Sequence, residues 1–126
     1  MISTKVADAS VANTSLFRSV VLLAPLGSVI SPESTVDSAI AVQIVSAEID
    51  DILPRQYHLQ PILKVAPQAV LTQASGAGHF SFVAPVMKKW SDQLGEVSKD
   101  PAGFDRTKFN AQLGTDLVTW FNNTLQ

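Results

Sequence analysis

Three short apolar runs, separated by longer polar stretches, set the pattern of this 126-residue chain. Two of them are SVVLLAP (Ser19 to Pro25) and AVQIVSAE (Ala41 to Glu48), and a third candidate is AVLTQAS (Ala69 to Ser75). Runs of this length, rich in β-branched residues, are typical of strands that are buried on both faces. A dozen or more residues join them, as parallel strands require. The pattern therefore predicts a three-stranded parallel sheet.

The end of the chain has the periodicity of an amphipathic helix. One apolar stripe at helical spacing is formed by Phe109, Leu113, Leu117, Trp120 and Phe121. Asp105 precedes the stripe and is a residue type that caps helices, while Phe104 and Phe109 hold the positions of a hydrophobic staple. The chain is therefore predicted to end in a helix of about 20 residues.

Two weaker helices are expected in the middle of the chain. In RQYHLQPILKVAP (Arg55 to Pro67), the helix should begin near Pro61 or be kinked there, because proline lacks a backbone N–H. FVAPVMKKWSDQLG (Phe82 to Gly95) has room for a short helix. Together the elements predict an α/β domain over residues 19 to 126, with about three parallel strands and flanking helices. Residues 1 to 18 are predicted to be a lead-in segment.

Composition narrows the classes of function. Apolar residues make up 46% of the chain and charged residues 16%, a balance that can fill a core. The net charge is −2 with no basic stripe, which argues against a nucleic-acid partner. There is no cysteine, so disulfides and thiolate metal sites are excluded. No signal-peptide pattern or membrane-spanning run is present, which favours a cytoplasmic protein without a membrane partner.

Two acid–base residues follow predicted strands. Asp50 comes just after the second strand, and His79 follows the third in SGAGHFSFVAP (75–85), where glycines permit a bend at the strand end. Ligands of open α/β sheets bind at the carboxyl ends of the strands. A carboxylate beside a histidine can accept its Nδ1 proton and fix its tautomer. If the two strands are neighbours, the pair is the supporting half of a nucleophile–histidine–acid triad.

The pair belongs to a set of motifs that resembles a known family. In chain order the motifs are SAEIDDILP (46–54), YHLQPILKVAP (57–67), SGAGHFSFVAP (75–85) and FDRTKFNAQLGTDLVTWF (104–121). Over about residues 19 to 125, the chain resembles the C-terminal part of α/β-hydrolases of the predicted dienelactone-hydrolase type. The resemblance implies a triad with Asp50 as the acid and His79 as the base, and Asp51 is the second choice for the acid. It also implies a small carboxylic-ester substrate and no cofactor.

The chain departs from the family at the nucleophile. No serine lies in the pattern G-x-S-x-G, the elbow that presents the attacking hydroxyl. Ser28 in LGSV and Ser75 in ASGAG are the nearest, and neither has the strand–elbow–helix context. The HGGG-type oxyanion element is also absent, and in the family both would lie upstream of residue 1. Val86, where relatives often carry a cysteine, is interpreted as a packing change. The resemblance thus implies a truncated hydrolase that is inactive alone.

The residues beside His79 have two interpretations. Phe80 and Phe82 could line a substrate-binding pocket, or they could pack in the core, with Phe82 under the short helix that follows. His58 lies in a polar helical stretch and is expected to be solvated. Trp90 is expected to pack in the core or to cover the sheet.

The acidic cluster also has alternatives. Asp50 could be only a turn or cap carboxylate, since aspartate is common in both places. Glu48, Asp50 and Asp51 could instead bind a divalent cation through oxygen ligands. Their spacing is not that of a calcium loop, so no metal site is predicted.

Two functions of different classes follow. In the first, Asp50 and His79 serve an esterase whose serine is supplied by an N-terminal half, on a separate chain or lost by truncation. In the second, the chain is a non-catalytic remnant that acts as a binding or self-association module. An exposed sheet edge promotes association, and a homodimer could complete a sheet of about six strands.

Overall fold

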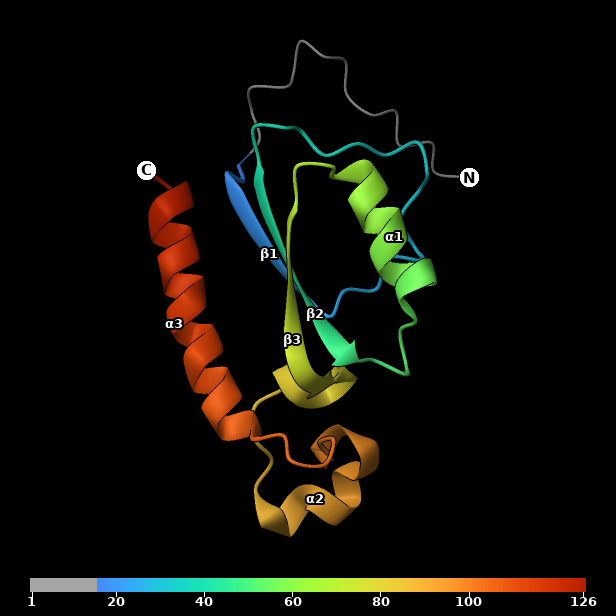
Figure 1. The fold of residues 1–126 in the computed structure, drawn as a ribbon, viewed down its shortest axis with the longest axis vertical. Helices are drawn as coiled ribbons and strands as arrows, with labels where there is room; N and C mark the ends of the chain where they lie inside the picture. The colour runs from blue at the N-terminus through green and yellow to red at the C-terminus, as the bar shows by residue number, and fades with distance from the viewer. Residues whose placement is uncertain (1–15) are drawn as a thin grey trace.

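The computed structural model describes residues 16–126, so most of the predicted lead-in segment lies outside the described residues. The strands β1 (Ser19–Leu23), β2 (Ala41–Ile49) and β3 (Val70–Gly78) form one parallel sheet in the order β1-β2-β3 (Figure 1). This confirms the predicted α/β fold with three parallel strands and flanking helices. The first two strands lie close to their predicted bounds, whereas β3 continues three residues past its predicted end at Ser75.

Two helices cover opposite faces of the sheet. Figure 1 shows α1 (Arg55–Val65) on one side and α3 (Arg106–Thr124) on the other. Beyond the carboxyl ends of the strands lie α2 (Lys88–Leu94) and two 3-10 turns, η2 (His79–Phe82) and η3 (Gly95–Ser98). Within residues 16–126, none of the helices is long and apolar enough to cross a membrane.

The core has two parts because β2 is apolar on both faces. Val42 and Ile44 pack toward α1, where Leu59 and Ile62 meet them. Ile44 is fully buried, and burial of a side chain of this size stabilises a fold by about 2 kcal/mol. On the other face, small strand residues lie against α3, in a cluster of Val45, Ala47, Ala74, Ala77 and Leu113.

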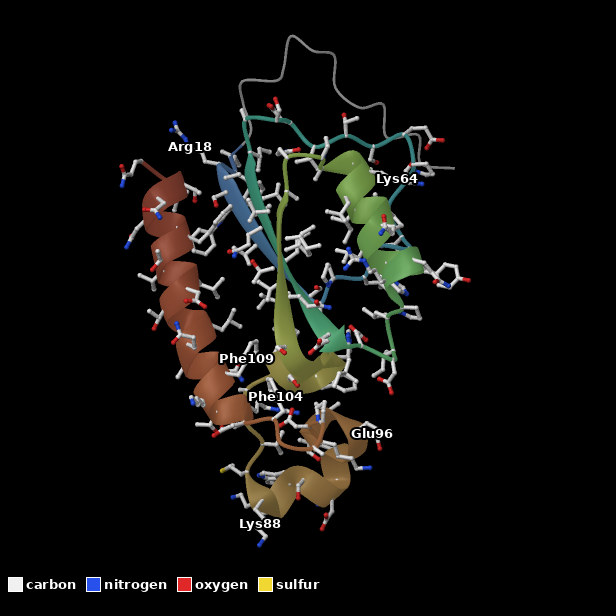
Figure 2. The ribbon with its side chains drawn as sticks, viewed as in Figure 1. Arg18, Lys64, Lys88, Glu96, Phe104 and Phe109 are labelled. Atoms are coloured by element: carbon white, nitrogen blue, oxygen red, sulfur yellow. The ribbon has the colours of Figure 1, made fainter. Side chains whose placement is uncertain are left out.

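The final helix is built as its sequence predicts. Asp105 Oδ1 accepts the backbone N–H of Lys108 at 2.9 Å, which confirms the N-cap. The rings of Phe104 and Phe109 lie side by side at the start of α3, with centroids 5.2 Å apart, as the staple requires (Figure 2). At the far end, Trp120 Nε1 donates to the hydroxyl of Ser19 at 2.8 Å. These contacts hold α3 along the sheet from β1 to the end of β3.

Two details differ from the predictions. The helix α1 begins at Arg55, so a start near Pro61 is wrong, and the helix instead runs through the proline, as the alternative of a helix kinked at Pro61 requires. The hydrogen bond that Pro61 cannot donate is outweighed by burial of Leu59 and Ile62 on either side of it. The prediction that Trp90 packs in the core or covers the sheet is wrong, because α2 lies beyond the sheet. Trp90 is 44% exposed on α2, and Lys89 Nζ lies 5.4 Å from the centroid of its ring.

Candidate active site

His79 and Asp50 meet at the carboxyl ends of two neighbouring strands. His79 is the first residue of η2, directly after β3, and Asp50 directly follows β2. Nδ1 of the histidine lies 2.9 Å from Oδ2 of the aspartate. The two side chains are 20% and 12% exposed, so the contact is largely shielded from water. Shielding strengthens a hydrogen bond between an imidazole and a carboxylate relative to the same bond in water.

The aspartate is held by its own loop. Asp50 Oδ1 accepts the backbone N–H groups of Ile52 at 3.1 Å and Leu53 at 2.8 Å. Oδ1 therefore binds the backbone of the turn, and Oδ2 contacts His79. The two alternatives for Asp50, turn former and histidine partner, are both present in one side chain. Asp51, the second choice for the acid, is exposed beside it.

A bulge interrupts the pairing of β2 with β3. Ala47 lies opposite Ala74 in regular register, but Ile49 then lies opposite Gly78. One residue of β2 therefore faces three residues of β3. In an unbroken ladder each residue of one strand faces one residue of its neighbour. The bulge adds two residues to β3, so the end of β3 is shifted by two residues relative to β2.

This shift of two residues places His79 level with Asp50. In regular register Asp50 would lie level with Ala77, and the histidine would extend two residues past it. Gly76 has a φ of 70° within the bulge, a conformation that glycine adopts at little cost. The predicted bend is therefore in the wrong place. The strand continues through the glycines to Gly78, and the bend is a bulge inside the strand.

Glu48, on the neighbouring strand β2, forms hydrogen bonds with the bulge. Its Oε2 accepts the N–H of Gly76 at 2.7 Å and the hydroxyl of Ser75 at 3.0 Å. These bonds, above all the one from Gly76, hold the pKa of the Glu48 carboxyl below its ordinary value. The carboxylate thus gives a partner to an N–H group that the disrupted ladder leaves without one. Sequence reasoning weighed Glu48 only as a cation ligand.

The acidic residues do not gather around a common point. The carboxylate of Glu48 is bound at the bulge, and that of Asp50 is divided between its loop and His79. In the part of the chain that the structure describes, no group of three or more acidic or histidine side chains could hold a metal ion.

The two phenylalanines after the histidine differ in their surroundings. Phe80 lies edge-on to the His79 ring, with centroids 5.0 Å apart and planes at 74°. Phe82 packs edge-on against Phe109 of α3 at 5.4 Å. Phe82 therefore has the core position that was its alternative role, although it packs under α3 rather than under the short helix α2. Phe80 is the one of the two that touches the histidine.

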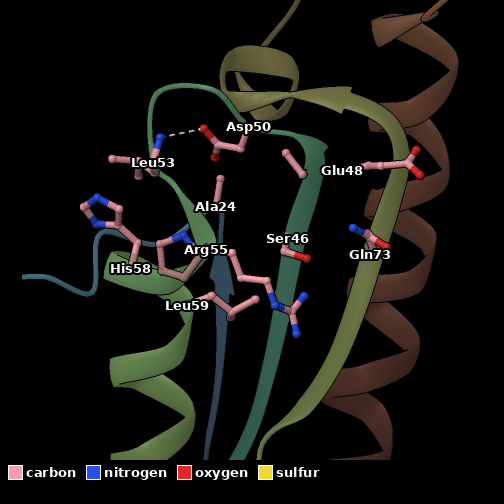
Figure 3. Close-up of a pocket in the computed structure, with 11 residues that line it drawn as sticks. Ala24, Ser46, Glu48, Asp50, Leu53, Arg55, His58, Leu59 and Gln73 are labelled. Carbon is pink, nitrogen blue, oxygen red and sulfur yellow. Dashed lines mark hydrogen bonds between the residues drawn. The ribbon is translucent and has the colours of Figure 1, made fainter.

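A small cavity of about 100 Å³, lined by both polar and apolar side chains, adjoins Asp50 on the α1 side of the sheet. Figure 3 shows it beside α1, with the Arg55 side chain extending from the start of α1 across β2. His58 also lines it and is not simply solvated as predicted, because its Nδ1 is buried and has no hydrogen-bond partner among residues 16–126. The backbone of Gly27 approaches His58 so closely that a Cβ there would lie 1.8 Å from the histidine carbonyl oxygen.

Neither serine singled out in the sequence forms a nucleophile elbow. The hydroxyl of Ser75 is bound to Glu48 in the bulge. Ser28 is exposed in the connection between β1 and β2 and lines a separate groove beside Tyr57 and Pro61. The described residues therefore supply an acid and a histidine in contact, and neither of these serines meets them.

The geometry assigns a tautomer to the histidine. An ionised Asp50 can only accept hydrogen bonds, so the neutral ring must carry its proton on Nδ1 to make the 2.9 Å contact. Nε2 is then an acceptor. A histidine in this state can take a proton from a hydroxyl group, and the carboxylate behind it stabilises the imidazolium that forms.

Comparison with known proteins adds no relative. No family model matches the chain, and no curated protein or solved structure matches it. The chemistry of the site is therefore argued from its own residues.

Proposed function

We propose that His79 and Asp50 are the base and the acid of a serine-esterase triad, in a protein that resembles α/β-hydrolases of the predicted dienelactone-hydrolase type. The observation that carries the proposal is the shielded contact of 2.9 Å between Nδ1 and Oδ2, with the second carboxylate oxygen fixed by the loop. A carboxylate that only formed a turn would not need its other oxygen directed at an imidazole.

The reaction would be acyl transfer from a carboxylic ester to serine and then to water. His79 Nε2 takes the proton of the serine hydroxyl as its oxygen attacks the ester carbonyl. The same proton passes to the leaving alcohol, and a water molecule repeats the sequence on the acyl-serine. Asp50 keeps the ring oriented and stabilises its charged form. The serine belongs to a G-x-S-x-G segment outside these residues, since none lies within them.

The proposal is tested by labelling with a fluorophosphonate, which forms a stable adduct with an activated serine. The full natural polypeptide, or the complex that contains this chain, is treated and the adduct is located by intact mass and peptide mapping. We expect one labelled serine, with a labelling rate that falls by roughly 10⁴-fold in His79→Gln and by a similar factor in Asp50→Asn.

The matched control is Asp51→Asn, which makes the same change one residue along on an exposed side chain. It should label at the wild-type rate. Labelling that survives His79→Gln unchanged, or no labelling of the folded wild-type protein, would contradict the proposal.

A second candidate function is self-association through β1. Within the described sheet, β1 pairs with a neighbour on one side only, although its residues are apolar on both faces. An unpaired edge of this kind can accept the same edge of a second copy. Sedimentation analysis would show a dimer that Leu23→Lys, at the exposed end of the strand, converts to a monomer. A monomer at all concentrations would exclude this candidate.

A further inference from the structure

A largely buried series of polar side chains runs from the histidine turn to the first residue of α3. It consists of Ser81, Asp100 and Arg106, together called the Arg106 relay. We propose that the Arg106 relay is a positioning device for His79, which fixes the direction of the imidazole ring and thereby its contact with Asp50. The inference rests on the proposed function for its purpose, but its geometry can be tested without any reaction.

Ser81 connects the relay to the histidine. Its hydroxyl accepts the backbone N–H of Gly78, the residue before His79, at 3.0 Å. The same hydroxyl donates to Asp100 Oδ1 at 3.1 Å, and the side chain is 1% exposed. A buried hydroxyl that both accepts and donates has one orientation. The start of η2 is therefore fixed to a carboxylate that is 19 residues away in sequence.

Arg106 fixes that carboxylate in turn. Its Nε lies 3.0 and 2.9 Å from the two oxygens of Asp100, and an Nη atom lies 2.9 Å from Oδ1. The remaining donors reach the carbonyls of Val97 at 2.9 Å and Lys99 at 3.0 Å. Arg106 is only 5% exposed, so its charge is stabilised by these partners rather than by water. A planar guanidinium can hold all of them at once, whereas a lysine cannot.

A second contact from α3 secures the same turn. Asn110, one helical turn after Arg106, directs its side-chain N–H groups at the carbonyls of Ser81 and Val83, at 3.4 and 3.3 Å. Gly78 is also confined, because a Cβ on it would lie 3.2 Å from the ring of Pro101. The turn that carries the histidine is therefore held on several sides by residues distant in sequence.

The ring itself has few supports of its own. Among residues 16–126 its polar contact is Asp50, and the ring packed edge-on against it belongs to Phe80 in the same turn. Any displacement of η2 therefore displaces the rings of both His79 and Phe80. A shift of the turn by a fraction of a hydrogen-bond length would lengthen the contact of 2.9 Å to Asp50. The Arg106 relay therefore controls the contact that the proposed chemistry depends on.

The alternative is that the relay only fastens the segment 83–105, which contains α2 and η3, to the rest of the fold. A purely structural role would change the stability of the protein without changing the state of the His79 ring in molecules that remain folded. The tautomer of the ring is therefore the decisive measurement, and ¹⁵N NMR of the full chain at alkaline pH reports it directly.

The experiment compares wild type with Ser81→Ala and Asp100→Asn. In the wild type, neutral His79 should be a single tautomer with its proton on Nδ1, and this proton should exchange slowly with water because it is bound to Asp50. In Asp100→Asn we expect a mixture of both tautomers and loss of the slowly exchanging Nδ1 proton. In Ser81→Ala, which leaves the ion pair intact, exchange of that proton should rise by about fivefold, the size expected for one lost hydrogen bond.

The matched control is Glu96→Gln, the same kind of change on the exposed part of the segment 83–105 (Figure 2). It should leave the His79 signals unchanged. If Asp100→Asn does not fold, the milder Ser81→Ala still decides the question. Folded variants with wild-type tautomer and exchange would overturn the positioning role. A failed fluorophosphonate test with altered His79 signals would instead reject the esterase and leave the relay in place.

Discussion

The two loops that present Asp50 and His79 are held in different ways. The loop after β2 is held by itself, because Asp50 binds N–H groups two and three residues further along the chain. The turn after β3 is held from a distance, by Asp100 through Ser81 and by α3 through Arg106. The aspartate is thus placed by local turn chemistry, whereas the histidine is placed by the tertiary fold.

The largest expected effect comes from breaking the distant support. Arg106→Met leaves the Asp100 carboxylate without its guanidinium partner in a mostly buried setting, and should lower the free energy of unfolding by about 3 kcal/mol. Urea unfolding measures the change. Lys99→Met removes an exposed pair with Glu96 on the same segment and should cost less than about 1 kcal/mol. Equal losses in the two variants would mean that burial of the Arg106 pair is unimportant.

Removing Asp50, which holds its own loop, should lower the free energy of unfolding somewhat less. Asp50→Ala removes the acceptor for two backbone N–H groups and for His79, and should destabilise the fold by about 2 kcal/mol. Asp50→Asn keeps an oxygen that can accept the N–H groups of the turn, so it should destabilise the fold by about half as much. Thermal unfolding of the two variants separates the turn from the histidine contact. Identical losses would show that the turn bonds contribute nothing.

The bulge that aligns the two loops can be tested through its glycine. Gly76→Ala should destabilise the protein by about 1 kcal/mol, because alanine is strained at a φ of 70° although space is available around it. Gly114→Ala is the matched control, since this glycine lies inside α3 with open space around it. It should stabilise the protein by about 0.5–1 kcal/mol. The same sign for both changes would contradict the assigned bulge geometry.

The smallest effect concerns pH. The pKa of Glu48 is lowered in the folded state by the N–H of Gly76 and the hydroxyl of Ser75, so its ionised form stabilises the fold. That stability is present above the ordinary pKa of a glutamate and is lost as the pH falls through the lowered value. Wild type should therefore be more stable than Glu48→Gln at neutral pH, and the difference should shrink in acid. A difference that grows in acid would reverse the assigned sign.

The local features could be predicted from sequence. The apolar runs gave the three strands, and Asp105 with its staple gave the last helix, because each signal lies within a few neighbouring residues. The placement of Asp50 and His79 after adjacent strands follows from strand order in a parallel sheet.

The remaining features depend on residues far apart in the chain. The bulge in β3 requires Glu48 to meet Gly76 across the sheet, and a strand pattern with glycines also fits a strand that simply ends. Arg106 lies 25 residues after Ser81 in the chain, and the two side chains are connected through Asp100, which binds both. The start of α1 has no cap signal, since Pro54 precedes it without a side-chain bond, so the sequence leaves open whether the helix begins near Pro61 or runs through it.

The central claim is that Asp50 orients His79 as a base. The most direct test is ¹⁵N NMR of the imidazole at alkaline pH in wild type and in Asp50→Asn. The account predicts a single tautomer with the proton on Nδ1 in the wild type. In Asp50→Asn the amide oxygen stays on the turn, so the NH2 group faces Nδ1 and the ring should carry its proton on Nε2 instead. A wild-type ring that carries its proton on Nε2, or one that is unaffected by Asp50→Asn, would contradict the account.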